Sequence, residues 1–476
     1  MCNNYQSKLK ELEQHSRMLE YDEQNRHQLN QKVEQIADRF LNALDKGNTY
    51  SISRPRKNSF KIDNSIHNVE DVLGTLEMEL FPHGVNAASG GHLGYIPGGG
   101  LYASAIGDYI AAFSNEYSGI YFGSPGAVEI EEACLTWLKE VFEFPESSIG
   151  NLTSGGSIAN LIALTAARDA KNVMRSLESE VIYLTAQVHH CVHKALRIIG
   201  LSHAKIRTVK MDENGRMKVD HLSELIKEDS SAGLNPFLLI GSAGTTDVGA
   251  IDPLSDMANV AQENDMWFHV DAAYGGFFKL LPELKSRFKG LERADSLVID
   301  PHKGLFLPYG LGAVLVKDRE AVFESHHYSA NYMQDAFSGD VPISPADVSP
   351  ELTKHFRALR MWLPLQLHGL EPFRAGLQEK IVLTHYFRHE LQKLDFCIGP
   401  EPDLSVSYFW YPRDNNQNDF NKKLIELCHE DGRVFLSSTL IDGKFVIRMA
   451  ILSFRTHKDT IDRAIEMIKD QLYKLI

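Results

Sequence analysis

Two ionisable residues, an aspartate and a lysine, each stand at or just beyond the end of a short apolar run. Asp271 closes the run MWFHVD (266–271), and Lys303 follows the run SLVID (296–300). Ligands of open α/β sheets bind beyond the carboxyl ends of the strands. A lysine amine forms a Schiff base with an aldehyde, and a carboxylate keeps a ring nitrogen protonated. Either residue alone would be interpreted as half of a structural salt bridge, but together they predict a site for an electrophilic cofactor.

A glycine-rich turn ahead of a helical segment offers a place for a phosphate group. The stretch NLTSGGSIANLIALTAAR (151–168) puts Gly155, Gly156 and Ser157 at the start of a strongly helical sequence. Glycines allow close approach to the backbone, and the free N–H groups and dipole of a helix N-terminus attract anions. An ordinary capped turn is the alternative for this motif alone. Beside the aspartate and the lysine, the motif predicts an aldehyde cofactor that carries a phosphate.

The elements that must position these residues are typical of an α/β protein. Short runs rich in β-branched residues alternate with helical patterns, which indicates a mostly parallel central sheet buried on both faces. Strand-like runs and a helical end near the C-terminus indicate a smaller α+β domain. The expected strands are 181–185, 206–211, 237–241, 266–271, 296–300 and 313–318 in the large sheet, then 406–411 and 444–451.

The beginning of the chain has a helical pattern with an apolar stripe. Val33, Ile36, Phe40 and Leu44 fall on one helical face, and the polar segment 51–65 interrupts the pattern. There are too few apolar positions for an independent core, so the stripe needs a packing partner. We therefore predict three parts: an N-terminal helical arm, 1–92; a large cofactor-binding domain, 93–372; and a small C-terminal α+β domain, 373–476.

The overall composition limits the partners and the compartment. The 476-residue chain has a formal charge of −14, from 49 basic and 63 acidic side chains. This balance argues against nucleic acid or an anionic membrane as the main partner, because both require a basic surface. Five widely spaced cysteines are typical of free thiols in a reducing compartment. Because we find neither a secretory signal nor an apolar stretch of roughly 18 residues, we expect a cytoplasmic protein with no membrane partner.

Two charged clusters have ordinary interpretations. The segment HHCVH (189–193) resembles part of a zinc helix, but the glutamate of H-E-x-x-H is absent and no third ligand is indicated. We therefore expect no metal, and a stacked or core role for its histidines. Arg357 and Arg360 follow Lys354 in a helical segment, and this charged face is interpreted as solvated or as an interface.

The motifs around Asp271 and Lys303 resemble those of the pyridoxal-phosphate-dependent group II amino-acid decarboxylases. That family includes aromatic-L-amino-acid, tyrosine, histidine and glutamate decarboxylases. HVDAAYGG is followed, 32 positions after its aspartate, by the lysine of DPHK. The resemblance extends over about residues 75–460. The other blocks that match in the family's order are SPGAVEIEEACLTWL (124–138), TSGGSIANLIAL (153–164), LTAQVHHCVHKA (184–195), GSAGTTDVGAID (241–252), KHFRALRMWLPLQLHG (354–369) and KFVIRMAILSFRT (444–456).

The resemblance implies a fold, a cofactor and a reaction. The fold is that of the pyridoxal-phosphate-dependent transferases (fold type I, aspartate-aminotransferase-like), as a homodimer with the active site at the interface. The reaction is decarboxylation of an L-amino acid, with aromatic substrates among the candidates. Lys303 would form the Schiff base with pyridoxal 5'-phosphate, Asp271 would pair with the pyridine nitrogen, and His189 would stack on the ring. The further implied contacts are Gly155, Gly156, Ser157 and His302 near the phosphate, Ala273 on the other ring face, and Thr246 near the ring hydroxyl.

Departures from the family leave the outcome and the substrate open. Aromatic-acid decarboxylases carry a loop tyrosine that protonates the substrate carbon; here that position falls near Pro345, and Tyr332 is the candidate substitute. A glycine, Gly304, stands where a tryptophan often follows the lysine. Gly119 stands where the aromatic-acid enzymes have an aromatic residue that lines the partner's pocket. An aldehyde synthase, a carbon–carbon lyase and a catalytically silent binding protein are therefore the alternatives. The candidate substrate-pocket residues are Pro97, Tyr117, Gly119 and Tyr332.

Overall fold

The computed structural model describes residues 2–327 and 342–476, which fall into two compact units, 1–86 and 87–476. In the first unit, Arg39 on one helix pairs with Glu77 on another at 2.7 Å. Of the predicted stripe, Ile36 is buried, whereas Val33 remains 48% exposed. Its elements are helices α1 (Cys2–Ser16), α2 (Glu23–Ala43) and α3 (Val69–Glu79), and the antiparallel strands β1 (Tyr50–Ser51) and β2 (Gly84–Val85).

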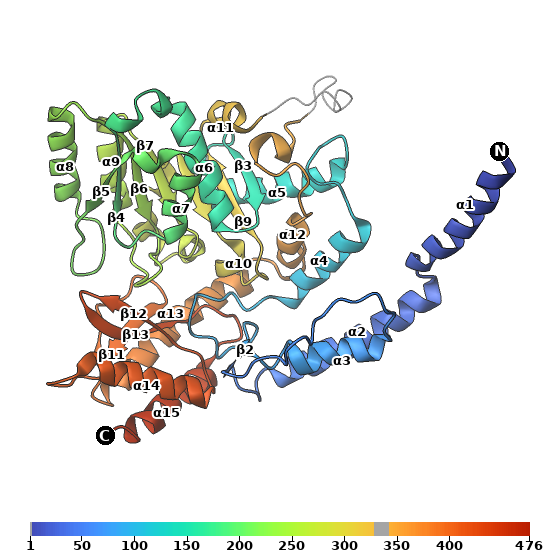
Figure 1. Ribbon diagram of the computed structural model, residues 1–476. Helices are drawn as coiled ribbons and strands as arrows, with labels where there is room; N and C mark the ends of the chain where they lie inside the picture. Colours follow the sequence, from blue (N-terminus) through green and yellow to red (C-terminus); the bar gives the residue numbers. More distant parts are fainter. Residues whose placement is uncertain (1, 328–341) are drawn as a thin grey trace. The chain divides into compact units, whose positions relative to one another are not determined.

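A seven-stranded sheet forms the centre of the second unit (Figure 1), in the order β3-β9-β8-β7-β6-β4-β5. Strands β4 to β8 pair in parallel, and β9 is antiparallel to both neighbours, so the predicted mostly parallel sheet is confirmed. The strands are β3 (Ile149–Thr153), β4 (Glu180–Thr185), β5 (Lys205–Val209), β6 (Asn235–Ser242), β7 (Trp267–Asp271), β8 (Ser296–Ile299) and β9 (Gly312–Val316).

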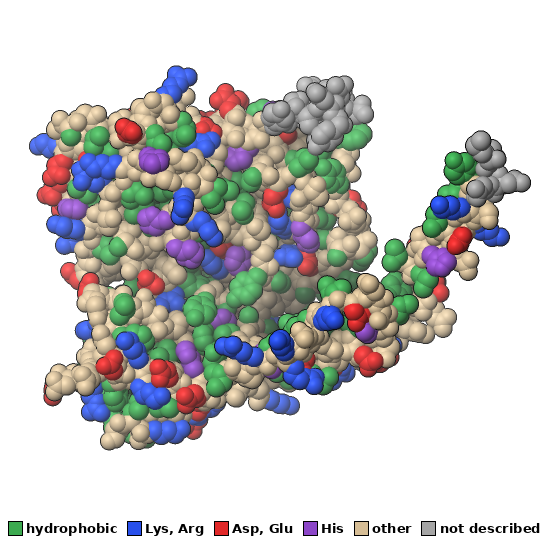
Figure 2. All heavy atoms as spheres, viewed as in Figure 1, with side chains coloured by type: hydrophobic (Ala, Val, Ile, Leu, Met, Phe, Trp, Pro, Cys, Tyr) green, Lys and Arg blue, Asp and Glu red, His purple; other side chains and the backbone are tan. Residues whose placement is uncertain are grey.

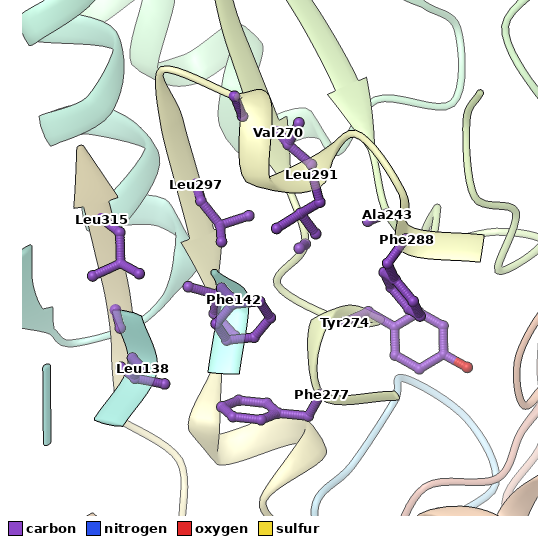
Figure 3. Close-up of a cluster of buried hydrophobic side chains, with 14 of the residues drawn as sticks. Leu138, Phe142, Ala243, Val270, Tyr274, Phe277, Phe288, Leu291, Leu297 and Leu315 are labelled. Carbon is purple, nitrogen blue, oxygen red and sulfur yellow. The ribbon is translucent and has the colours of Figure 1, made fainter. Parts of the chain in front are cut away.

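Both faces of this sheet are buried, because successive side chains of a strand point to opposite faces. Leu297 belongs to a cluster with Leu138 and Phe142 of α5 (Figure 3), whereas its neighbour Val298 packs in a second cluster with Ile162 of α6. The helices of this part are α4 (Tyr102–Ser114), α5 (Pro125–Phe142), α6 (Gly156–Ala170), α7 (His190–Ile198), α8 (Val219–Ser231), α9 (Leu254–Glu263), α10 (Pro301–Gly304), α11 (Arg319–His326) and α12 (Ala358–His368).

The C-terminal part contains a four-stranded antiparallel sheet in the order β10-β11-β13-β12. Its core joins this sheet to three helices, as the sequence predicts for an α+β arrangement. The predicted boundary at residue 372 falls in the first turn of α13, and the three-part division stays a prediction. The elements are α13 (Glu371–Gln392), β10 (Cys397–Ile398), β11 (Val406–Trp410), α14 (Gln417–Asp431), β12 (Ser437–Ile441), β13 (Lys444–Ala450) and α15 (Lys458–Tyr473).

Basic and acidic side chains are interspersed over the face of the molecule seen in Figure 2. Within the described parts of the chain, none of the helices has the length and apolar character to cross a membrane.

Candidate active site

A cavity of about 400 Å³ opens at the carboxyl ends of β4, β6, β7 and β8. This is the edge of a parallel sheet where ligands bind. Every cofactor-binding residue predicted from the sequence lines it, although these residues come from five separate segments. The lining residues are Ser154, Gly155, Gly156, Ser157, Asn160, Gln187, His189, Cys191, Ser242, Gly244, Thr245, Thr246, Asp271, Ala273, Tyr274, Asp300, His302 and Lys303.

Lys303 is placed by a short helix that begins directly after β8. Pro301 occupies the first turn of α10, where a fixed φ suits the start of a helix. The Lys303 Nζ lies 2.9 Å from Asp300 Oδ2, one turn back. Burial lowers the pKa of Lys303, but the carboxylates of Asp300 and Asp271 outweigh this effect and raise the pKa overall. In the cofactor-free protein Lys303 is therefore held as an ammonium ion.

Asp271 ends β7 and is fixed by two hydrogen bonds. Its Oδ1 accepts from the backbone N–H of Ala273 at 3.0 Å, and its Oδ2 accepts from Asn160 Nδ2 at 3.3 Å. The two donors hold the carboxylate group in one orientation. The small side chain of Ala273 leaves space beside this carboxylate, as the sequence predicts for a flat ligand.

The glycine turn between β3 and α6 has the geometry of an anion cradle. Thr153 Oγ1 accepts from the Gly155 N–H at 3.3 Å and donates to the Gly155 carbonyl at 3.0 Å. Gly155 has a φ of 148°, which L side chains rarely adopt. A Cβ on Gly156 would lie 3.1 Å from Asp300 Oδ2. The glycines therefore bring the first amides of α6 to the cavity wall, where they can bind an anion.

Two histidines flank this cavity in defined orientations. His189 is the N-cap of α7, and its Nδ1 accepts from the Cys191 N–H at 3.3 Å. His302 donates from Nδ1 to the Leu311 carbonyl at 2.6 Å, which fixes its ring. Burial lowers the pKa of each histidine. Among the residues described, no group of three His, Cys, Asp or Glu side chains is arranged to hold a metal ion.

Asp300 is a site residue that the sequence reasoning missed. Its side chain is buried, Oδ1 has no hydrogen-bond partner, and Oδ2 contacts Lys303. The signal was present in the DPHK motif, where a carboxylate precedes the lysine by three positions and therefore shares its helical turn.

The Asp300→Asn variant is expected to lower the pKa of Lys303, because it removes the nearest carboxylate. Below that pKa, each unit of decrease raises the fraction of neutral amine about tenfold. We would measure, as a function of pH, the rate at which borohydride traps pyridoxal phosphate on the cofactor-free protein. In Asp300→Asn this rate should begin to rise at a lower pH than in the wild type. Asp295→Asn, at the opposite end of β8, is the matched control and should leave the pH profile in place. Identical profiles for Asp300→Asn and wild type would contradict this role.

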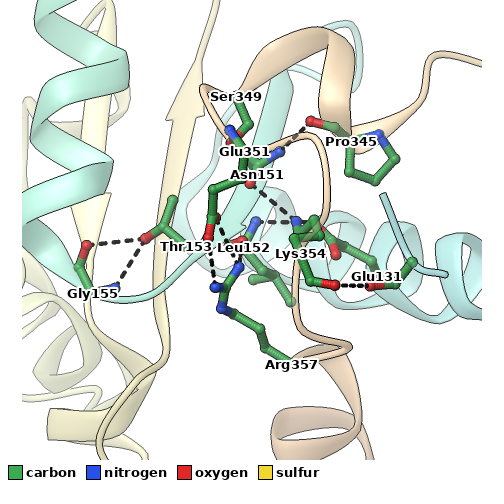
Figure 4. A network of polar contacts seen from close by, with 11 residues as sticks. Glu131, Asn151, Leu152, Thr153, Gly155, Pro345, Ser349, Glu351, Lys354 and Arg357 are labelled. Atoms are coloured by element: carbon green, nitrogen blue, oxygen red, sulfur yellow. Dashed lines mark hydrogen bonds and ion pairs between the residues drawn. The ribbon is translucent and has the colours of Figure 1, made fainter. Parts of the chain in front are cut away.

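A second missed feature is a buried polar network behind the glycine turn (Figure 4). Lys354 donates to Glu131 Oε1 at 2.6 Å and to Asn151 Oδ1 at 3.2 Å. Arg357 pairs with Glu351 through contacts of 2.9 and 2.8 Å. The solvated alternative of the predicted charged face is therefore wrong for Lys354 and Arg357, which are 4% and 6% exposed. The partners of Lys354 lie far away in the sequence on α5 and β3, so a local charge pattern could not reveal them.

Arg448 of β13 also supports the cavity wall and was missed. It is buried, and it donates from Nε to the Asp247 carbonyl at 3.0 Å and from Nη2 to the Thr246 carbonyl. The turn that carries Thr246 is thus held by the C-terminal sheet.

Of the predicted substrate-pocket residues, the three that the structure describes, Pro97, Tyr117 and Gly119, do not line this cavity. Pro97 precedes Gly98, whose Cβ position would lie 2.2 Å from the His302 carbonyl, so this segment packs against the lysine turn. A Cβ on Gly119 would lie 2.2 Å from the Leu352 carbonyl, which leaves no space for an aromatic side chain. Tyr117 is partly exposed, and Tyr332 lies outside the described residues. Their contribution to a partner's pocket stays a prediction.

The chain is similar to known proteins in both sequence and structure. The chain matches the Pyridoxal-dependent decarboxylase conserved domain over residues 56–412. It is 34% identical over 384 residues to the aromatic-L-amino-acid decarboxylase of Bacillus atrophaeus, which covers 79% of this chain and 80% of that protein. A phenylacetaldehyde synthase of Arabidopsis thaliana is 28% identical over 427 residues, 86% of this chain and 87% of the relative. The crystal structure of Oryza sativa TDC with PLP and tryptamine has a TM-score of 0.90 at 23% identity, over 96% of this chain and 99% of that chain.

Proposed function

The chain belongs to the pyridoxal-dependent decarboxylase family, and from this premise we propose that it converts an aromatic L-amino acid into the amine and carbon dioxide. It is a pyridoxal-phosphate-dependent carboxy-lyase of fold type I. The observation that supports the assignment is a single cavity that combines Lys303, Asp271 and the glycine turn before α6. The aromatic substrate is the finer part of the proposal, and the name of the Bacillus atrophaeus relative supports it.

The residues present fit pyridoxal phosphate. The glycine turn leaves space that a Cβ on Gly156 would narrow, and the cavity contains an amine, Lys303, opposite a carboxylate, Asp271. We expect Lys303 to hold the aldehyde carbon, Asp271 to hold the ring nitrogen, and the amides of α6 with His302 to hold the phosphate. When bound, the cofactor supplies an electron-withdrawing ring that stabilises the negative charge left at the substrate Cα.

The chain's own groups prepare this chemistry by controlling charge. Asp300 Oδ2 holds the Lys303 ammonium at 2.9 Å, and the amine becomes nucleophilic only when it loses this proton. The Asp271 carboxylate favours a protonated ring nitrogen, because it is anionic and faces a partly enclosed cavity. His189, fixed at the start of α7, offers a flat ring surface to the same cavity.

A product assay is expected to show stoichiometric carbon dioxide and amine from one or more aromatic L-amino acids. The holoenzyme would be incubated with a panel of L-amino acids while carbon dioxide, ammonia and hydrogen peroxide are measured separately. Carbon dioxide without peroxide is the expected result, because decarboxylation followed by protonation consumes no oxygen. Equal amounts of peroxide and ammonia would instead establish an aldehyde synthase, the alternative favoured by the absence of a tyrosine near Pro345. A colourless protein that takes up no pyridoxal phosphate would overturn the enzyme assignment.

A homodimer in the cytoplasm is part of the proposal. Helix α4 exposes an apolar side chain at almost every turn, namely Tyr102, Ile106, Tyr109 and Phe113. An exposed apolar stripe of this kind is typical of a protein interface, and a second copy of the chain would cover it. Free thiols at Cys134, Cys191, Cys397 and Cys428 support a reducing compartment. Light scattering in solution measures the mass of the particle, and we expect the mass of two chains.

A further inference from the structure

A series of side-chain hydrogen bonds leads from Asp271 into the interior of the sheet. Asn160 Nδ2 lies 3.3 Å from Asp271 Oδ2, and Asn160 Oδ1 lies 2.9 Å from His269 Nε2. His269 Nδ1 is 2.8 Å from Ser296 Oγ, which accepts from Trp267 Nε1 at 2.9 Å. We call the five residues Trp267, Ser296, His269, Asn160 and Asp271 the relay.

The groups at the ends of the relay determine the direction of every hydrogen bond. Asn160 Nδ2 also donates to the Gly156 carbonyl at 2.9 Å, and a carbonyl can only accept. The amide oxygen of Asn160 must therefore face His269, so His269 donates from Nε2. At the other end, the indole N–H of Trp267 can only donate. Ser296 Oγ therefore accepts from Trp267 and donates its own proton to His269 Nδ1.

The relay is enclosed in the protein. His269, Asn160 and Ser296 are each 0% exposed. Burial lowers the pKa of His269 to about 4, so the ring stays neutral at physiological pH and keeps the Nε2–H tautomer. Both nitrogens of this neutral ring form hydrogen bonds, and the ring therefore holds the Asn160 amide in one orientation. In that orientation its N–H group is presented to the cavity-facing carboxylate of Asp271.

We propose that His269 and Asn160 are positioning residues that hold the Asp271 carboxylate aimed at the ring nitrogen of pyridoxal phosphate. This inference rests on the proposed function, because it gives Asp271 a cationic partner. Neither residue is assumed to touch the reacting atoms of the substrate. A purely structural relay would stabilise the sheet without changing how the cofactor affinity depends on pH.

The other ionisable groups around Asp271 are few. Lys303 on α10 is cationic, and the Asp271 carboxylate contributes to its raised pKa. Asp300, directly after β8, carries a second carboxyl group, whose Oδ2 contacts Lys303. His189 beside α7 has its pKa lowered by burial, and burial raises the pKa of Cys191 to about 12, so this thiol stays neutral. Cys191 Sγ shares the Asn160 amide, at 3.6 Å.

The test compares the pH dependence of cofactor affinity in four single variants of the full chain and in the double variant that combines His269→Phe with Asn160→Ala. His269→Phe keeps a ring but removes the Nε2 donor, and Asn160→Ala removes the N–H group that Asp271 accepts. His269→Gln keeps a donor near the Nε2 position and is the conservative rescue. Tyr183→Phe is the matched control: it removes a buried hydrogen bond of 2.9 Å, from Tyr183 on β4 to Asp229, remote from Asp271. Pyridoxal phosphate binding to each cofactor-free protein would be followed by absorbance from acid to neutral pH.

We expect the affinity for pyridoxal phosphate to fall as the pH is lowered, which is the acid limb of its pH profile. In His269→Phe and Asn160→Ala this acid limb should lie at higher pH than in the wild type. At neutral pH, affinity should fall about tenfold, the magnitude of one hydrogen bond to a charged group. The double variant should shift no further than either single variant, because both break the same relay. His269→Gln and Tyr183→Phe should follow the wild type.

Three results would overturn the inference, and they are distinguishable. If the wild type binds cofactor and the His269→Phe limb coincides with it, the relay has no positioning role while the proposed function stands. An equal shift in Tyr183→Phe would mean that the effect reports general destabilisation. Failure of the wild type to bind pyridoxal phosphate would remove the proposed function and this inference together.

Discussion

Replacement of Lys303 by alanine is expected to abolish covalent capture of pyridoxal phosphate and to lower the rate of amine formation roughly 10³-fold or more. Among the described residues that line the cavity, Lys303 is the only one with an amine. The negative charges of Asp271 and Asp300 both raise the pKa of this amine. Borohydride reduction of the wild-type holoenzyme, followed by peptide mass spectrometry, should place the added mass on the peptide that contains Lys303.

The matched control is Lys285→Ala, which removes an exposed lysine that pairs with Glu143 outside the cavity. This variant should be labelled at Lys303 like the wild type and should keep its rate. Stoichiometric labelling of Lys303→Ala at another lysine, with the rate retained, would show that the cavity does not hold the aldehyde through Lys303.

Those strands of the large sheet that carry continuous apolar runs could be predicted from the sequence. Parallel strands are buried on both faces, so residues such as Val298 and Ile299 are apolar whichever face they meet. Strand β3 was not predicted, because it contains Gly150 and Asn151. The Asn151 side chain donates to the Pro345 carbonyl at 2.9 Å, a partner supplied only by the tertiary fold. Local hydrophobicity cannot indicate a strand whose polar side chain has its hydrogen-bond partner far away in the sequence.

In the candidate site, too, residues in local motifs could be predicted, whereas residues that depend on distant partners could not. Lys303, Asp271 and the glycine turn stand in short motifs whose residue types indicate their chemistry. By contrast, Asn160 and His269 are 109 positions apart and gain their meaning only when β7 and α6 come together. A buried histidine within an apolar strand has no pattern that identifies its partner. The sequence therefore predicts groups that could react and leaves unseen the groups that orient them.

Replacement of Asp271 by asparagine is expected to lower kcat roughly 10³-fold, the effect of losing one well-placed charge interaction in an enclosed site. An amide carries no negative charge, so the ring nitrogen would lose the partner that favours its protonated form. The amide would also fit its surroundings poorly. If its oxygen accepts from the Ala273 N–H, its NH₂ group faces the Asn160 NH₂ group, and two donors oppose each other. The rate of carbon dioxide release and the affinity for pyridoxal phosphate measure both effects.

A half-buried aspartate, Asp295, directly before the start of β8, separates loss of charge from loss of stability. Asp295 Oδ2 accepts from the Phe268 N–H at 2.7 Å, and burial raises the pKa of this carboxyl. Asp295→Asn therefore perturbs a half-buried carboxyl beside β7 without touching the cavity, and kcat should stay within about twofold of the wild type. Asp271→Asn should still capture the cofactor on Lys303, because the amine and Asp300 are intact. If Asp271→Asn retained the wild-type kcat, the carboxylate would have no part in stabilising charge at the substrate Cα, and the role given to the relay would fall with it.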